Sequence, residues 1–185
     1  MSPAAPRDPA IEPDTKDWTW VLEKPCPECG YDARAVRRDE VAHRVSVNTR
    51  AWRRVLGGPD VRRRPFPGVW SPLEYGCHVR DVHRVFAERV RSMLAQDDPL
   101  FDNWDQDEAA VTGAYDAQDP QAVADELDVA AAGVVEVYGS VRDDQWHRPG
   151  RRSNGSAFTV ESIARYHVHD VEHHLFDVSG VPPAT

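Results

Sequence analysis

The chain has 185 residues and a formal net charge of −9, with 41% hydrophobic and 29% charged residues. This length suits one domain with a packed core and is short for two. The acidic balance disfavours nucleic-acid binding as the main role, because like charges repel phosphate backbones. No apolar run reaches the roughly 20 residues that span a bilayer, and residues 1–13 contain no apolar signal segment. With only three cysteines and no closed disulfide set, we expect a cytoplasmic protein.

The N-terminal 32 residues are predicted to stand apart from the rest of the chain. Residues 1 to about 16 are rich in Pro, Ala and Asp, which is typical of a disordered tail. Residues 17–32 mix aromatic side chains and turn formers with Cys26 and Cys29, and we expect them to form an irregular arm packed on the main body. Residues 33–180 then form the single domain.

Helical periodicity and helix-start signals predict four long helices in this domain. Ser71, Pro72 and Glu74 have the pattern of a capping box with proline in the first turn. Residues 99–119 are acidic and poorly periodic, and no convincing pair of strands appears. The predicted fold class is therefore all-α, a four-helix bundle with an irregular N-terminal arm. The expected helices are, in chain order, about 33–56, 71–97, 120–141 and 159–178.

The last predicted helix has two distinct faces. One face is apolar and includes Ile163, Val171 and Leu175, with His167 and His174 at its edge. The nearly opposite face carries His169 and His173, flanked by Tyr166 and Phe176. The pattern fits a helix that packs on one face and lines a pocket with the other, but it does not say which face points to the bundle axis.

A divalent metal site is predicted from three histidines. His169 and His173, at positions i and i+4, lie one turn apart on the same face, and His78 on the second helix lies in line with apolar residues that point inward. Imidazole is a common neutral ligand for Zn, Ni and Fe. The alternative is that these are core histidines satisfied by hydrogen bonds. His167 and His174, seven residues apart, are the rival pair.

The pair Cys26 and Cys29 has the spacing of half a zinc knuckle. Three interpretations remain open: a reduced structural turn, a redox dithiol, or half of a metal site that histidines complete. Two basic clusters, Arg62 to Arg64 and Arg148 with Arg151 and Arg152, read as solvated loops, or as a rim that attracts an anionic substrate.

The segment Trp70-Ser71-Pro72-Leu73-Glu74-Tyr75-x-x-His78, followed by His169-x-x-x-His173-His174, resembles the DinB/YfiT-like superfamily. The resemblance covers roughly residues 35–179. It implies a four-helix bundle that holds a divalent metal through one histidine of the second helix and two of a late helix, here His78, His169 and His173. The isomerase branch usually has Glu where this chain has His169, so the chain resembles the three-histidine branch more closely.

The resemblance implies a metal-dependent enzyme, since relatives include mycothiol and bacillithiol S-transferases, mycothiol-dependent maleylpyruvate isomerases and metal hydrolases. We favour a low-molecular-weight thiol S-transferase that binds a small-molecule substrate, with zinc as the metal and nickel or iron as alternatives. A hydrolase, a non-catalytic stress-associated metal-binding module and a metal-free bundle are the other hypotheses, and a homodimer is one option for the assembly. The residues expected to orient the ligands or to meet the substrate are Glu74, Tyr166, Asp170, Arg151 and Arg152.

Overall fold

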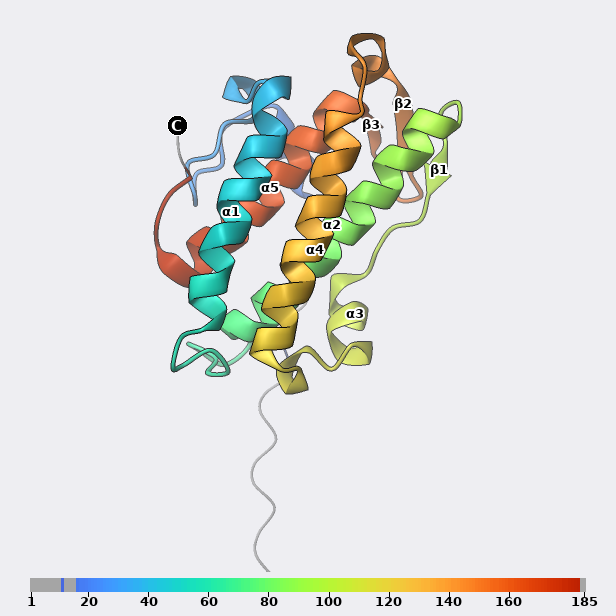
Figure 1. Ribbon diagram of the computed structural model, residues 1–185. Helices are drawn as coiled ribbons and strands as arrows, with labels where there is room; N and C mark the ends of the chain where they lie inside the picture. Colours follow the sequence, from blue (N-terminus) through green and yellow to red (C-terminus); the bar gives the residue numbers. More distant parts are fainter. Residues whose placement is uncertain (1–10, 12–15, 184–185) are drawn as a thin grey trace, which may run out of the picture.

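The computed structural model describes residue 11 and residues 16–183, so most of the predicted disordered tail lies outside the described residues. Four long helices form the body of the molecule (Figure 1). The bundle expected from the sequence is therefore confirmed. No helix within the described ranges combines the length and the apolar character that a membrane crossing requires. The long helices are α1 (Val41–Leu56), α2 (Pro72–Ala95), α4 (Pro120–Gly139) and α5 (Val160–Ser179).

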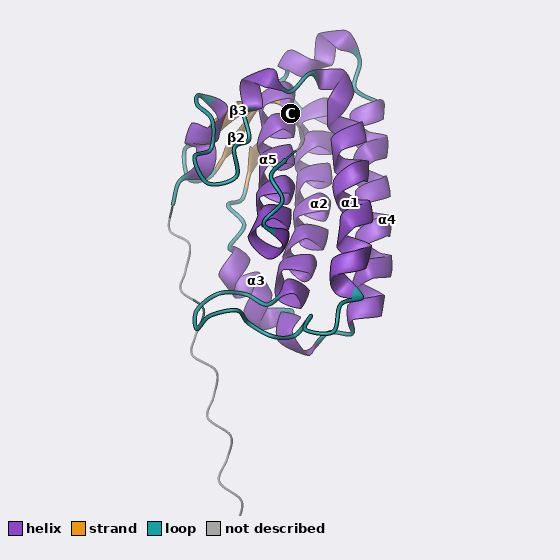
Figure 2. Ribbon diagram, turned by 90° about the vertical axis from the view of Figure 1, so that its left-hand side faces the viewer, coloured by secondary structure: helices purple, strands orange, loops and turns teal. Residues whose placement is uncertain are grey.

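Each long helix packs mainly against two others, in the cyclic order α1, α4, α2, α5. Helices α1 and α2 follow one another in the chain but sit diagonally across the bundle, and the four helices run side by side (Figure 2). A short helix, α3 (Gln106–Thr112), lies within the acidic segment that joins α2 to α4. Because α5 contacts both α1 and α2, it has one face toward the bundle interior and another left for other parts of the chain.

The helix starts follow local capping chemistry. The Ser71 hydroxyl accepts from the amide of Glu74, and the Glu74 carboxylate accepts from the amide of Ser71, so the predicted capping box is present at α2. Thr159 caps α5 in the same way with Ser162. Helix α1 starts later than predicted, at Val41 instead of about 33, because residues 33–40 form two short 3-10 turns separated by extended backbone.

The structure is not strictly all-α, because the loop before α5 forms part of a small sheet. Strand β2 (Pro149–Arg152) pairs antiparallel with β3 (Ala157–Thr159) and parallel with β1 (Leu100–Phe101). The strands have only two to four residues, too few to show the alternating pattern by which strands are found in a sequence. The sheet ties the α2–α3 connection to the start of α5.

Helix α5 turns its apolar face to the bundle axis. Val160, Ile163 and Val171 are fully buried in the core, and so is His167 at the edge of this face. The Nε2 atom of His167 lies 2.9 Å from Nδ1 of His83, and its Nδ1 lies 2.9 Å from the Tyr138 hydroxyl. His167 is therefore a hydrogen-bonded core histidine, and the face with His169 and His173 points away from the axis.

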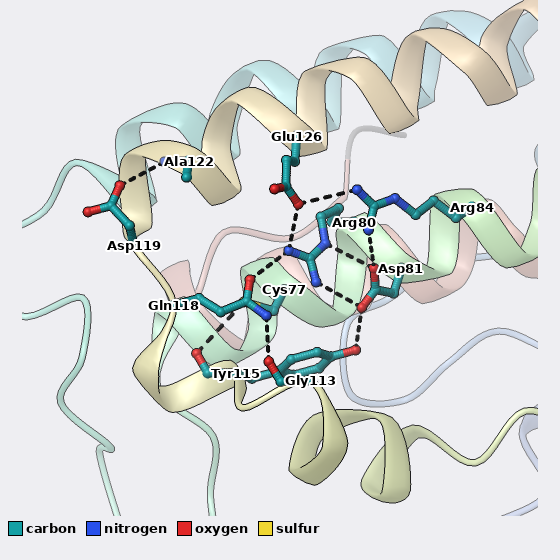
Figure 3. Close-up of polar contacts among 10 residues, drawn as sticks. All are labelled: Cys77, Arg80, Asp81, Arg84, Gly113, Tyr115, Gln118, Asp119, Ala122 and Glu126. Atoms are coloured by element: carbon teal, nitrogen blue, oxygen red, sulfur yellow. Dashed lines mark hydrogen bonds and ion pairs between the residues drawn. The ribbon is translucent and has the colours of Figure 1, made fainter.

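A polar network joins α2, α4 and the segment between them (Figure 3). The Arg80 guanidinium donates to both carboxylate oxygens of Asp81, to Gln118 and to Glu126, and the Tyr115 hydroxyl donates to Asp81 over 2.6 Å. Arg80 is almost fully buried, so its charge is compensated by these partners. The network anchors the connecting segment against α2 one turn from His78.

The N-terminal arm, residues 16–36, packs along α5 on the side away from the bundle axis (Figure 1). The Tyr31 hydroxyl donates to the carbonyl of Arg165 over 2.6 Å, and Arg165 donates back to the carbonyl of Val36 over 3.0 Å. Val21 and Tyr31 are buried in the core cluster. The arm thus covers the second face of α5.

Candidate metal centre

Helix α5 carries two pairs of possible metal ligands, offset by one residue. His169 and His173 form one i, i+4 pair, and Asp170 and His174 form the other. Because an α-helix turns 100° per residue, roughly, the two pairs lie on neighbouring faces. The structure places each pair with a different partner element: the first faces the N-terminal arm and the second faces α2.

Asp170 and His174 lie together with His78 of α2, and the three residues form the α2–α5 group. One ligand atom of each of the three residues lies within 4.8 Å of the others. Nε2 of His78 is 3.5 Å from Oδ1 of Asp170, and Nε2 of His174 is 3.7 Å from the same oxygen. The three side chains therefore point at one small volume between α2 and α5.

Two members of this group, His78 and Asp170, have buried polar atoms without hydrogen-bond partners. His78 is 0% exposed, and neither of its ring nitrogens has a hydrogen-bond partner among the described residues; the same holds for Oδ1 of Asp170. Buried polar atoms without partners are costly and rare in folded proteins. Nε2 of His78 and Oδ1 of Asp170 face the same small volume, an arrangement that a bound cation would satisfy.

Neighbouring side chains fix the orientation of these ligands. The His78 ring stacks on Trp104, with centroids 5.4 Å apart, and lies 5.2 Å from the ring of Trp70. Nδ1 of His174 is 3.0 Å from Oδ2 of Asp177, so the ring turns Nε2 toward Asp170. A carboxylate behind a ligating histidine fixes the ring and raises its basicity.

Charge and burial favour a neutral imidazole at position 78 and an ionised carboxylate at position 170. Burial lowers the pKa of His78 below its usual value of 6.5, although Asp170 acts in the other direction. Burial alone would raise the pKa of Asp170, but the nearby rings of His78 and His174 outweigh it and hold that pKa well below the usual 3.8. Both groups are thus in the protonation state that metal binding needs.

A cavity of about 650 Å³ opens beside this group, and Asp170 and His174 form part of its wall. The cavity is large enough for a small organic molecule. Its lining mixes aromatic faces with hydrogen-bond donors and acidic groups. Its aromatic and basic lining residues include Lys16, Trp70, Trp104, Arg152 and Tyr166.

The residues expected to meet the substrate fall into two classes. Tyr166 and Arg152 line the cavity, and burial raises the pKa of Tyr166 to about 12, so its hydroxyl stays protonated. Arg151 instead pairs with Asp98 at the surface over 2.9 Å. Glu74 is engaged by the Arg64 guanidinium and by its own capping box rather than by a ligand of the group.

The other pair of α5, His169 and His173, meets the two cysteines of the arm. One ligand atom from each of Cys26, Cys29, His169 and His173 lies within 4.8 Å of the others, and all four residues are buried. Sγ of Cys26 is 3.7 Å from Nδ1 of His173. The predicted set of His78, His169 and His173 is thus divided between two groups.

Two members of the α2–α5 group, Asp170 and His174, were not among the ligands expected from the sequence. Asp170 was expected only to orient a ligand, and His174 was considered as the partner of His167. Their signal was present, because Asp170-x-x-x-His174 has the same spacing as His169-x-x-x-His173. Spacing alone does not choose between the two registers.

Two kinds of comparison place the chain among known proteins. The family model of the DinB superfamily matches residues 43–176. Among curated proteins, none matches this chain in sequence. The fold is similar to that of YfiT from Bacillus subtilis, described as a probable metal-dependent hydrolase with an unusual four-helix bundle topology. The TM-score is 0.72 at 15% identity, over 77% of this chain and 84% of YfiT.

Two structures of the mycothiol-dependent maleylpyruvate isomerase, one of them a histidine-to-alanine mutant, are also similar. Their TM-scores are 0.61 and 0.65 at 12% and 11% identity, and each match covers 81% of this chain and 64% of the isomerase chain. Identities this low establish the shared fold. The family match spans most of the bundle, from α1 to the last turn of α5. The chain belongs to the DinB superfamily.

Proposed function

We propose that the chain is a metal-dependent enzyme that holds a divalent ion with His78, Asp170 and His174 and transfers a low-molecular-weight thiol to an electrophilic small molecule. The convergence of these three side chains beside the 650 Å³ cavity is the observation that supports the proposal most directly. Three protein ligands next to an open cavity are typical of catalytic metal sites, whereas structural sites are closed by four.

The residues present fit such an ion. Nε2 of His78 and Oδ1 of Asp170, neither with a hydrogen-bond partner among the described residues, are ligand atoms that a divalent transition metal accepts. When bound, the ion supplies Lewis acidity, which lowers the pKa of a thiol or a water that binds to it. Asp170 contributes one negative charge, so the ligand set as a whole compensates half of the charge of a divalent cation.

The remaining chemistry belongs to side chains around the ligands. Asp177 holds the His174 ring, and the His78 ring stacks on Trp104 and lies 5.2 Å from the ring of Trp70. The Tyr166 hydroxyl, protonated at neutral pH, can donate a hydrogen bond to a substrate oxygen in the cavity. Arg152 places positive charge on the same lining, where it would bind a carboxylate of the thiol or of the electrophile, whereas Lys16 is already paired with Glu28.

A thiol is favoured over water as the nucleophile for two reasons. The cavity has aromatic faces and polar donors along one lining, which suits a polar thiol and an apolar electrophile side by side. The expectation of a three-histidine set depended on His169, whereas the proposed set contains the carboxylate of Asp170, and the resemblance stated above gives a carboxylate ligand to the mycothiol-dependent isomerase branch. Hydrolysis, suggested by the description of YfiT, is the competing outcome of the test.

The test measures metal content and thiol consumption together. Purified protein would be assayed for loss of free thiol with mycothiol, bacillithiol or glutathione and a chromogenic electrophile, and in parallel for cleavage of an activated ester. We expect His174→Ala to lose one metal equivalent and the thiol-dependent rate, and His43→Ala, an exposed histidine of α1, to retain both. Full thiol transfer by His174→Ala, or ester cleavage without thiol transfer in the wild type, would overturn the proposal.

A further inference from the structure

The N-terminal arm brings two thiols to a pair of histidines that the proposed function does not use. We propose that Cys26, Cys29, His169 and His173 form a second metal site, a closed structural zinc centre that fixes the arm to α5. This inference is independent of the proposed function, because the α2–α5 group shares none of the four residues.

The arm folds into a tight turn that presents both thiols on one side. The amide of Gly30 donates to the carbonyl of Cys26 over 2.9 Å, and the amide of Cys26 donates to the carbonyl of Tyr31 over 2.8 Å. Gly30 has a φ of +82°, a left-handed conformation that glycine adopts without steric cost. Both cysteines are free thiols, so the turn does not depend on a disulfide.

Helix α5 supplies the other two ligands in matching positions. The rings of His169 and His173 lie one turn apart with centroids 5.1 Å apart. All four ligand atoms lie within 4.8 Å of one another. Tetrahedral zinc with its usual bond lengths separates its ligand atoms by about 3.3 to 3.8 Å, so small side-chain rotations are enough to close the site.

The four side chains are buried, and one of their ring nitrogens has no partner. Cys26, Cys29, His169 and His173 are 1%, 2%, 3% and 6% exposed. Nε2 of His169 has no hydrogen-bond partner among the described residues. A buried ring nitrogen without a partner is costly, and a zinc ion bound between the four side chains would supply that partner.

Charge and outer contacts fit zinc as well. Two thiolates and two neutral imidazoles make a divalent centre electrically neutral, and binding releases the two thiol protons to solvent. If Nδ1 of His173, on the Cys26 side, binds the ion, its Nε2–H faces carboxylates: Glu28 at 3.5 Å and Asp177 at 3.7 Å. Such carboxylate contacts orient ligating histidines in known zinc sites.

His169 and His173 also line the cavity, but four protein ligands would fill the coordination of a tetrahedral zinc, which assigns the site a structural role. Trp18 covers it, with its ring 5.6 Å from that of His169 and 5.0 Å from that of His173. Trp18 and Glu28 also line the cavity beside the α2–α5 group. A zinc ion here would therefore hold one wall of the cavity in place.

The first test is metal content of the full chain, expressed with zinc in the medium and measured by mass spectrometry. Cys29→Ser is expected to lose one zinc equivalent relative to the wild type. Cys77→Ala, a buried free cysteine of α2 outside both groups, is expected to lose none. His174→Ala is expected to keep the zinc of the cysteine site, whatever happens at the other group. Unchanged zinc in Cys29→Ser would overturn the inference.

The second test needs no variant to fold. Cobalt replaces zinc in the wild-type protein, and a thiolate-to-cobalt charge-transfer band with tetrahedral d–d bands is expected. Titration of the thiols with an organomercurial should then release one zinc from the native zinc form, detected with a chromogenic chelator. Absence of the charge-transfer band, or reaction of both thiols with the organomercurial without release of zinc, would contradict the site.

Discussion

His173 and His174 are consecutive residues of α5, yet their rings are inclined at 81° with centroids 5.9 Å apart and face different ligand groups. The Asp177 carboxylate lies one turn further along the helix, behind both rings. Its Oδ2 is 3.0 Å from Nδ1 of His174, and its Oδ1 is 3.7 Å from Nε2 of His173. One carboxylate thus supports the two groups at once.

Replacing Asp177 by Asn is therefore expected to weaken metal binding at both groups. Loss of the negative charge lowers the basicity of the two imidazoles, and changes of this kind cost about tenfold or more in metal affinity. The loss should be greater at the α2–α5 group, where the contact is shorter. Competition with chelators of graded affinity measures the metal dissociation constants of the two groups. Asp143→Asn, which changes an exposed carboxylate outside both groups, is the control, and equal affinities in the two variants would contradict the role of Asp177.

Removing zinc is expected to destabilise the arm locally, while the helices of the bundle stay folded. In the arm, few backbone hydrogen bonds stabilise the turn around Cys26 and Gly30. Helices α2 and α4 are stabilised by the backbone hydrogen bonds within each helix and by packing in the core. After chelation, amides of residues 18–31 should exchange with solvent faster, with little change in α2 and α4. Hydrogen exchange followed by mass spectrometry resolves these segments. A uniform increase in exchange across the chain, or no increase in the arm, would contradict the proposal that zinc fixes the arm to α5.

The Arg80–Asp81 pair gives a prediction about stability that is separate from either metal. Asp81→Asn removes the carboxylate that accepts from Arg80 and Tyr115 in the network of Figure 3. We expect a loss of about 2 kcal/mol in the free energy of unfolding, typical of hydrogen bonds to a charged group. Denaturant unfolding at neutral pH measures it. Asp125→Asn, which breaks an exposed pair with Arg53, should change stability by about 0.5 kcal/mol or less.

The same pair determines whether its contribution to the free energy of unfolding rises or falls with pH. Burial raises the pKa of Asp81, but the Arg80 guanidinium and the Tyr115 hydroxyl outweigh it, and the pKa lies below the usual 3.8. The contribution of Asp81 is therefore complete above pH 3.8 and is lost as the pH falls through the lower pKa of the folded state. The stability difference between wild type and Asp81→Asn should shrink on acidification. A difference that grows would contradict this assignment.

The helices could be predicted from the sequence because their signals are local. The capping box of Ser71 and Glu74, and Thr159 before α5, fix helix starts within a few residues of chain. The start of α1 was missed because its apolar stripe begins only at Val41, and the turns before it have no periodic signal. The short strands β2 and β3 were missed for the same reason.

The candidate site depends on contacts between distant parts of the chain. The sequence shows that α5 has two ligand pairs, but the rotation of the helix in the bundle decides which pair meets His78. Packing of Ile163 and Val171 sets that rotation. The contact of Cys26 with His173 joins residues 147 positions apart. No spacing rule predicts such a contact, so completion of the cysteine site by histidines was only one of three interpretations.

Trp104 offers a test of the cavity itself. Its ring stacks on the His78 ring at 5.4 Å and forms part of the cavity lining. Trp104→Ala should leave the metal content unchanged, because Trp104 is no ligand, but it removes an aromatic face against which a substrate packs. Loss of such a contact is worth about 1.4 kcal/mol, a tenfold rise in KM for the thiol or the electrophile.

Steady-state kinetics with each substrate varied in turn identifies which of the two packs on Trp104. Trp20→Ala is the matched control, because Trp20 belongs to the arm and stacks on Trp18 without lining the cavity. If Trp104→Ala keeps its metal and both KM values match those of Trp20→Ala, the substrate does not bind in this cavity. If instead Trp104→Ala loses metal, the aromatic ring acts by holding His78, and the effect on KM should disappear when metal is supplied in excess.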